Sequence, residues 1–263
     1  MQGASINITM SHAKNLALDQ ESVKQSRDQL FAKKRYKISR FAFDESVAAV
    51  FDDMIRRSVP GYQSILQMIG HFCDVYARPA TRLYDLGASL GSATHIMAAA
   101  AADRDCLVVA VDNSEPMVEK LKITLANPAT DVEVVCEDLL DTPITNASVV
   151  VLNLAMQFIA PEQRDGLVEK IYHGLNPGGI LLLTEKISFE DQARDAHMTE
   201  LYYAYKKTQG YSDLEIAQKR TALENVLICD TENAHLDRLK SSGFNHVDVW
   251  FRVLNFMSLV AVK

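Results

Sequence analysis

The sequence is poor in residues arranged for metal or disulfide chemistry. It has four cysteines among 263 residues. They show no zinc-site spacing, and three lie in apolar runs where a cysteine is an ordinary small core residue. None of the seven histidines has metal-ligand spacing such as HExxH, and no convincing nucleophile–base pair is present. These absences predict no metal and no covalent catalysis, and the cysteines fit a reducing cytoplasm.

Long apolar runs are absent as well. No stretch reaches the ~18 residues needed to span a bilayer. Residues 1–10 lack the basic start and the long apolar run of a secretory signal. We therefore expect a soluble, intracellular protein that does not contact a membrane.

Positive charge is scarce in the body of the chain and concentrated at its start. Residues 1–40 contain eight Lys or Arg against three Asp or Glu, which leaves nineteen against thirty-one, a net charge of −12, for residues 41–263. This acidity argues against direct nucleic-acid binding, which rests on cations that neutralise phosphates. The basic start is a candidate anion binder, but such termini are more often solvated. We expect residues 1–40 to be a partly disordered extension and residues 41–263 to be one domain.

From about residue 80 the chain alternates β-branched runs with helical patterns, which is typical of a parallel sheet covered by helices. Helices are expected at Ala93–Ala102, Glu115–Ala126 and Pro161–Leu175, the last stopped by Asn176–Gly179. The expected parallel strands are Arg82–Leu86, Leu107–Asp112, Val132–Cys136, Ser148–Leu152 and Ile180–Thr184.

The C-terminal part has a different pattern. Val247–Val253 and Phe256–Val262 flank Leu254-Asn255 as two runs close enough to pair antiparallel. An α/β fold with a mostly parallel seven-stranded sheet closed by such a hairpin is the Rossmann-like class I methyltransferase pattern. Residues 41–76 and 188–230 read as helices, and we expect both to form a lid over the carboxyl ends of the strands, where open α/β sheets bind ligands.

A glycine-rich loop follows the first expected strand. Gly87, Ser89 and Gly91 precede a helix, and small residues there let the backbone turn tightly and approach a ligand. The spacing is GxSxG and differs from the GxGxxG of dinucleotide binders. By itself the loop is equally consistent with an ordinary turn.

Polar residues follow the next strands in order. Asp112 ends the second strand, where a carboxylate can accept hydrogen bonds from both ribose hydroxyls of a nucleoside. The alternative is that Asp112 is a helix N-cap before Ser114. Asp138 has the chemistry to accept from an adenine amine, with a turn or cap as the alternative. Asn153 ends the fourth strand, where the central atoms of such a ligand would lie. Taken together, these positions predict a nucleoside site.

Two sets of motifs carry a family resemblance. Tyr84–Gly91, Ala110–Asn113, Glu137-Asp138 and Asn176–Gly179 resemble class I S-adenosylmethionine-dependent methyltransferases. Most of residues 41–263 is more specifically similar to the carboxy-S-adenosyl-L-methionine synthases, in the segments Phe43–Val47, Asp53–Tyr62, Glu185–Glu190, Gln218–Arg220 with Leu223–Val226, and Leu254–Phe256 with Ser258–Val260. The segment before Lys37 has no counterpart in that pattern, and Ala88 stands where related loops often carry cysteine.

The resemblance implies a reaction in which S-adenosylmethionine gains a carboxyl group on its sulfonium methyl, with prephenate as donor and phenylpyruvate as by-product. It also implies a homodimer. The product would serve a separate tRNA carboxymethyltransferase that converts a wobble uridine to the oxyacetic acid form. Two alternatives stay open: a small-molecule methyltransferase, and a non-catalytic S-adenosylmethionine-binding partner protein.

The resemblance further implies the site residues. Tyr62 and Arg220 would face the new carboxylate as the candidate catalytic residues. S-adenosylmethionine would be held by these two together with Gly87, Ala88, Ser89, Asp112, Asn113, Asp138, Leu139 and Asn153.

Arg220 suits its implied role because a planar, permanently charged fork pairs two-pronged with a carboxylate. Its alternative is a surface arginine that pairs with Glu215 or Glu224 on the same helix. For Tyr62 the alternative is a tyrosine that packs a turn against the core. Arg57 is a weaker candidate for a cation that binds the donor.

Overall fold

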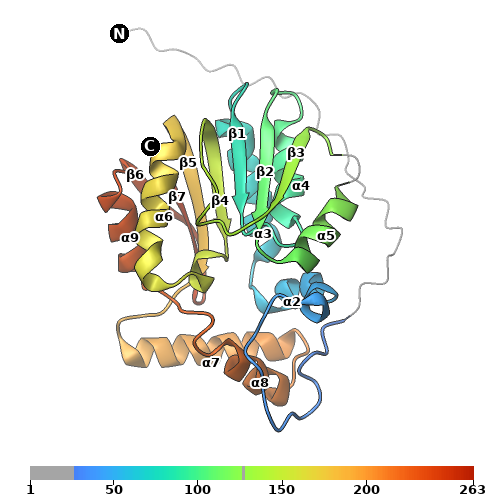
Figure 1. Cartoon of the computed structure of the whole chain (residues 1–263). Coiled ribbons are helices and arrows are strands. Elements are labelled where there is room, and N and C mark those ends of the chain that lie inside the picture. Colours follow the sequence, from blue (N-terminus) through green and yellow to red (C-terminus); the bar gives the residue numbers. More distant parts are fainter. Residues whose placement is uncertain (1–26, 126–127) are drawn as a thin grey trace.

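A seven-stranded sheet forms the centre of the computed structural model, which describes residues 27–125 and 128–263 (Figure 1). The strand order is β3-β2-β1-β4-β5-β7-β6, in which the first five strands are parallel and β7 is antiparallel to both of its neighbours. The predicted Rossmann-like methyltransferase fold with its terminal hairpin is confirmed. The strands are β1 Arg82–Leu86, β2 Leu107–Asp112, β3 Asp131–Cys136, β4 Ala147–Asn153, β5 Leu175–Lys186, β6 His246–Val253 and β7 Phe256–Val262.

β5 begins earlier than the sequence pattern predicted. The expected stop Asn176–Gly179 lies inside the strand, which starts at Leu175. The Gly178 N–H donates to the carbonyl of Lys263 at 2.8 Å, and the Lys263 N–H donates to the carbonyl of Gly179 at 3.0 Å. Hydrogen bonds to the last residue of the chain therefore hold the turn sequence in the sheet.

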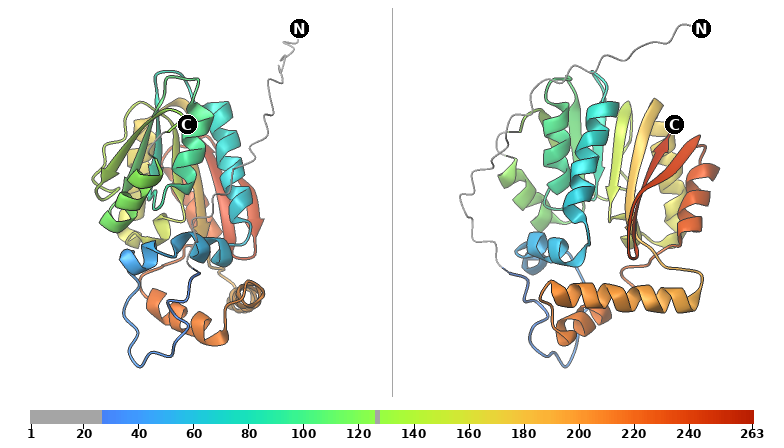
Figure 2. Two further views of the ribbon diagram at one scale, coloured as in Figure 1. Left: turned by 90° about the vertical axis from the view of Figure 1, so that its right-hand side faces the viewer. Right: turned by 180° about the vertical axis from the view of Figure 1, so that it is seen from behind.

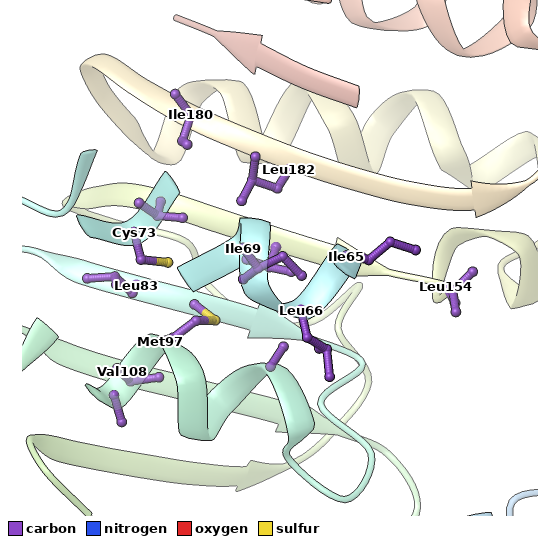
Figure 3. Close-up of a cluster of buried hydrophobic side chains, with 14 of the residues drawn as sticks. Ile65, Leu66, Ile69, Cys73, Leu83, Met97, Val108, Leu154, Ile180 and Leu182 are labelled. Carbon is purple, nitrogen blue, oxygen red and sulfur yellow. The ribbon is translucent and has the colours of Figure 1, made fainter. Parts of the chain in front are cut away.

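Helices cover both faces of the sheet (Figure 2). α3, α4 and α5 pack on one face, and α6 and α9 pack on the other. Alternate residues of one strand serve the two cores: Leu83 faces α3 and α4 (Figure 3), whereas Tyr84 belongs to the opposite core. These helices are α3 Tyr62–Tyr76, α4 Ser92–Ala101, α5 Glu115–Thr124, α6 Pro161–Gly174 and α9 Glu232–Ser241. The predicted helix end Ala126 lies outside the described residues.

The remaining helices gather at one end of the sheet. α2, α7 and α8 lie below it in the view of Figure 1. α3 belongs to the face layer and not to this cover, although residues 41–76 were all expected to be lid. The reason is its apolar stripe of Ile65, Ile69 and Cys73, which is buried against the sheet (Figure 3). The other helices are α1 Glu45–Ala48, α2 Phe51–Ser58, the 3-10 turn η1 Met156–Phe158, α7 Gln192–Thr208 and α8 Asp213–Leu223.

Part of the predicted basic extension packs against this cover. Asp28 is buried, and its carboxylate accepts a hydrogen bond of 2.7 Å from the Tyr211 hydroxyl. The Gln218 side chain on α8 donates to the carbonyl of Lys33 at 3.0 Å and accepts from the N–H of Arg35 at 2.7 Å. These contacts tie residues 28–35 to α8 and to Tyr211, which precedes it. Residues 1–26 lie outside the described residues.

Candidate functional site

A cavity of about 740 Å³ lies between the carboxyl ends of the strands and the helical cover. Its volume is in the range of small-molecule sites. All ten residues that the sequence assigned to ligand binding line it, namely Tyr62, Gly87, Ala88, Ser89, Asp112, Asn113, Asp138, Leu139, Asn153 and Arg220. The structure thus brings together residues from α3, four strand ends and α8.

The glycine loop is fixed by the strand beside it. The N–H groups of residues 87 and 88 both donate to the carbonyl of Val111, at 2.8 and 2.9 Å. Gly87 has φ +82°, and a Cβ there would lie 2.7 Å from the Cβ of Ala155. Gly91 has φ +81° at the start of α4, where a Cβ would collide with the Leu121 side chain. Both positions therefore require glycine.

Asp112 organises the loop and keeps capacity for a ligand. One carboxylate oxygen accepts from the Ser89 N–H at 2.8 Å, and the other accepts from the Ser114 N–H at 2.9 Å. Ser114 is the residue that caps α5. Asp112 therefore supports the start of this helix through Ser114, which is part of the capping role considered as its alternative. Burial raises the pKa of the Asp112 carboxyl, and its two backbone hydrogen bonds oppose this. Each oxygen can still accept a second hydrogen bond, as two ribose hydroxyls require.

Asp138 also forms a local turn. Its Oδ1 accepts from the Leu140 N–H at 2.9 Å, and its Oδ2 lies 3.5 Å from the Asn113 amide nitrogen, which donates to it. The turn that we considered as an alternative is present. It aims the carboxylate at the cavity, which Leu139 also lines.

Asn153 fits a ligand that brings a hydrogen-bond donor. Its side-chain oxygen is buried and has no partner among the residues that the structure describes. A buried acceptor without a partner costs about 1–3 kcal/mol. The ammonium group of S-adenosylmethionine is a suitable donor, so this oxygen is consistent with the predicted ligand.

Glu185 holds the turn that follows Asn153. Its two carboxylate oxygens accept from the N–H groups of Met156 at 2.8 Å and Gln157 at 3.1 Å, at the start of η1. Burial raises the pKa of Glu185 to about 8, against the opposing effect of these hydrogen bonds. Sequence reasoning included Glu185 in a family motif but gave it no role.

Two further buried groups flank the loop. Tyr62 is the first residue of α3, and burial raises the pKa of its hydroxyl to about 12, while a hydrogen bond with the Ser92 side chain opposes this rise. Asp85 accepts from the Thr94 hydroxyl at 2.6 Å, and burial raises its pKa to about 6. Both residues line the cavity, and the Tyr62 hydroxyl has the chemistry to donate to a carboxylate there.

Arg220 lines the cavity from α8 and is exposed. Its guanidinium has no hydrogen bond or ion pair within residues 27–125 and 128–263. The pairing with Glu215 that we considered is not formed, because Glu215 bonds to Ser212 in the capping box that starts α8. The charge of Arg220 is therefore available to an anion in the cavity.

Arg57 is not among the residues that line the cavity, and its role as a donor-binding cation stays a prediction. Its guanidinium donates to the carbonyl of Gln209 at 2.8 Å and pairs with Asp53 at 3.0 Å. It also stacks on the Tyr211 ring at 3.9 Å. Arg57 joins α2 to the residues between α7 and α8, which is a structural role.

Sequence reasoning missed three lysines that line the cavity: Lys186 at the end of β5, Lys206 on α7 and Lys219 on α8. Lys186 was identifiable by the strand-end rule that singled out Asn153, and Lys219 directly precedes Arg220. Lys206 had no sequence signal, because α7 has no resolved pattern that marks its inner face. With the acids at the strand ends, these lysines give the cavity an acidic side and a basic side.

The described ranges contain neither a candidate metal site nor a candidate membrane-spanning helix. No group of three or more His, Cys, Asp or Glu residues there is suited to a metal ion. No helix there is both long and apolar enough for a bilayer crossing.

The fold is shared with solved methyltransferases. Human N-acetylserotonin methyltransferase, solved with S-adenosylmethionine, matches 83% of this chain and 55% of its own with a TM-score of 0.58 and 18% identity. A putative S-adenosyl-L-methionine-dependent methyltransferase of Methanococcus maripaludis matches 87% of this chain and 97% of its own, with a TM-score of 0.56 and 17% identity. At such identities the likeness concerns the fold alone.

Sequence comparisons are more specific. Residues 83–179 match the model of a methyltransferase domain. The carboxy-S-adenosyl-L-methionine synthase of Shewanella oneidensis is 50% identical over 242 residues, which is 90% of this chain and 99% of that protein. The protein of the same name from Shewanella baltica is 50% identical over 240 residues, again 90% and 99% of the two chains. The chain therefore belongs to the carboxy-S-adenosyl-L-methionine synthase family.

Proposed function

We propose that this protein converts S-adenosylmethionine and prephenate to carboxy-S-adenosyl-L-methionine and phenylpyruvate. The observation that carries the proposal is Arg220, whose guanidinium has no partner among the described residues and lies in the same cavity as the residues predicted to bind S-adenosylmethionine. An ordinary methyl-transfer site has no carboxylate to bind, whereas a carboxylated product requires a cation at this place.

The overall chemistry balances without a metal or an oxidant. The prephenate dianion yields phenylpyruvate, carbon dioxide and hydroxide; the hydroxide removes a proton from the sulfonium methyl, and carbon dioxide bonds to that carbon, with water as the other product. The protein supplies position, charge and exclusion of water. In this scheme Asp112 and Asn153 hold the nucleoside and amino-acid parts, and Arg220 with the Tyr62 hydroxyl binds the new carboxylate.

The experiment is incubation of the purified protein with S-adenosylmethionine and prephenate, followed by mass spectrometry. We expect a carboxylated sulfonium product and an equal amount of phenylpyruvate. Arg220→Leu should lose product formation while it still binds S-adenosylmethionine. Arg194→Leu is the matched control, because Arg194 is exposed on α7, packs over Phe189 and does not line the cavity.

The outcomes separate the alternatives. S-adenosylhomocysteine release that needs no prephenate and survives Arg220→Leu would indicate a methyltransferase. S-adenosylmethionine binding without any turnover would indicate a partner protein.

We also infer that the enzyme acts as a cytoplasmic homodimer whose product serves a separate tRNA carboxymethyltransferase. The acidic body of the chain is consistent with a protein that does not itself bind tRNA. Light scattering of the purified protein tests the dimer. Loss of the oxyacetic acid form of wobble uridine in cells that lack the protein tests the link to tRNA.

A further inference from the structure

The basic side of the cavity contains more charge than Arg220 alone supplies. Lys206 and Lys219 are 4% and 7% exposed, and Lys186 lines the cavity beside them. None of these ammonium groups has an ion pair with a carboxylate in the described parts of the chain. Because a buried charge without a counter-ion costs several kcal/mol, the buried Lys206 and Lys219, with the partly exposed Lys186 beside them, favour an anion among the three ammonium groups.

Neighbouring protein groups neutralise these lysines only in part. The carboxylate of Asp28 attracts both Lys206 and Lys219, and it keeps its charge while it accepts from the Tyr211 hydroxyl. Glu215 adds a weaker attraction on Lys206. The Lys219 ammonium donates to the Ser58 hydroxyl at 3.3 Å, a neutral partner. The cluster therefore keeps a net positive charge.

Two tyrosine rings lie close to the three ammonium groups. Nζ of Lys186 and Nζ of Lys206 lie 5.0 and 5.8 Å from the centre of the Tyr202 ring. Nζ of Lys206 and Nζ of Lys219 lie 4.9 and 5.8 Å from the centre of the Tyr211 ring. Cation–π attraction offsets part of the repulsion between the lysines. Tyr202 also lines the cavity, so the charges adjoin ring surface suited to a cyclic ligand.

We propose that Lys186, Lys206 and Lys219 form an anion subsite that binds the carboxylate which the donor retains in phenylpyruvate. This inference rests on the proposed function and adds residues to it. Arg220, one residue beyond Lys219 on α8, then pairs with the carboxyl group that is transferred. The carboxylates on the strand side of the cavity repel both ends of a dianion, so the donor is held against the helical cover.

Phenylpyruvate tests the subsite without turnover. Its affinity is measured by calorimetry in the presence of S-adenosylmethionine, whose own affinity reports that each variant is folded. Lys206→Met and Lys219→Met should each weaken phenylpyruvate binding roughly thirtyfold, the equivalent of ~2 kcal/mol for a buried charge pair. Arg220→Leu should leave it nearly unchanged, because phenylpyruvate lacks the transferred carboxyl group.

Lys207→Met is the matched control, since Lys207 is the next residue on α7, is exposed and pairs with Asp213 at 2.6 Å. Its affinity for phenylpyruvate should equal that of the wild-type protein. The proposal would be overturned if Lys206→Met and Lys219→Met bound phenylpyruvate as tightly as the wild-type protein does, or if the wild-type protein did not bind it.

The same variants separate this proposal from the proposed function. If the carboxylated product forms but the lysine variants bind phenylpyruvate as the wild-type protein does, the subsite is rejected and the proposed function stands. Lysine-dependent phenylpyruvate binding without carboxylated product rejects the function and keeps the anion subsite. If both hold, the KM for prephenate rises in the lysine variants and the KM for S-adenosylmethionine does not.

Discussion

Lys206→Met should stabilise the ligand-free protein while it weakens donor binding. Burial, reinforced by the charges of Lys219 and Lys186, lowers the pKa of the Lys206 ammonium from 10.5 to about 7; Asp28 and Glu215 oppose the change. At ~1.4 kcal/mol per pH unit, this corresponds to about 5 kcal/mol against the charged form in the folded protein. Methionine is unbranched and apolar and fills a similar space without charge.

The pH dependence fixes the sign of the effect. At low pH the lysine is protonated in both folded and unfolded chains, so the folded protein carries the whole penalty. Between the folded pKa of about 7 and the unfolded value of 10.5, the unfolded chain binds more protons, so wild-type stability rises with pH. We expect the variant to be more stable by about 3 kcal/mol near pH 6, after relaxation around the lysine, and its advantage to vanish toward pH 10.

The assay is urea unfolding followed by circular dichroism at several pH values, with no ligand present. Lys207→Met, with its exposed and paired lysine, should match the wild-type protein throughout. The reasoning would be refuted by a Lys206→Met protein that is less stable than wild type near pH 6. It would equally be refuted by a stability difference that does not change with pH.

Three other changes test the site. Glu185→Ala leaves the N–H groups of Met156 and Gln157 without their acceptor. Urea unfolding should show that the free energy of unfolding falls by about 3 kcal/mol, and the KM for S-adenosylmethionine should rise. If neither quantity changes, Glu185 does not hold the turn after Asn153. Gly91→Ala combines φ +81° with a collision at Leu121, so unfolding should show a loss of about 2 kcal/mol or more, and a stable variant would contradict this. Asp112→Asn removes acceptor charge beside the loop; calorimetry should show about tenfold weaker S-adenosylmethionine binding, and wild-type affinity would argue against ribose binding there.

The strand ends were predictable because they depend on local pattern and on one general property of parallel sheets. Apolar runs marked five strands, and the carboxyl ends of parallel strands meet at one edge. Asp112, Asp138 and Asn153 were therefore expected to converge, and they line one cavity. Arg220 and Tyr62 came from the family resemblance, since neither position has a local signal that separates a ligand contact from a surface or packing role.

Other features depend on partners far away in the sequence. The predicted start of β5 was wrong because Lys263, the last residue of the chain, forms hydrogen bonds with Gly178 and Gly179 in the expected turn. Arg57 does not line the cavity because its guanidinium is held by Asp53 and by the carbonyl of Gln209, which is 152 residues away. A local pattern does not specify either partner.

The sequence alone determined the methyltransferase-like sheet, the glycine loop and the polar residues that end its strands. The reason is that the spacing of apolar residues and the order of the elements along the chain are properties of short segments. Only the tertiary structure showed which lysines line the cavity beside Arg220. Lys186, Lys206 and Lys219 come from β5, α7 and α8. Whether a lysine on such an element is solvated or buried depends on how the segments of the helical cover pack on one another, and long-range contacts such as those of Asp28, Gln218 and Arg57 hold that packing.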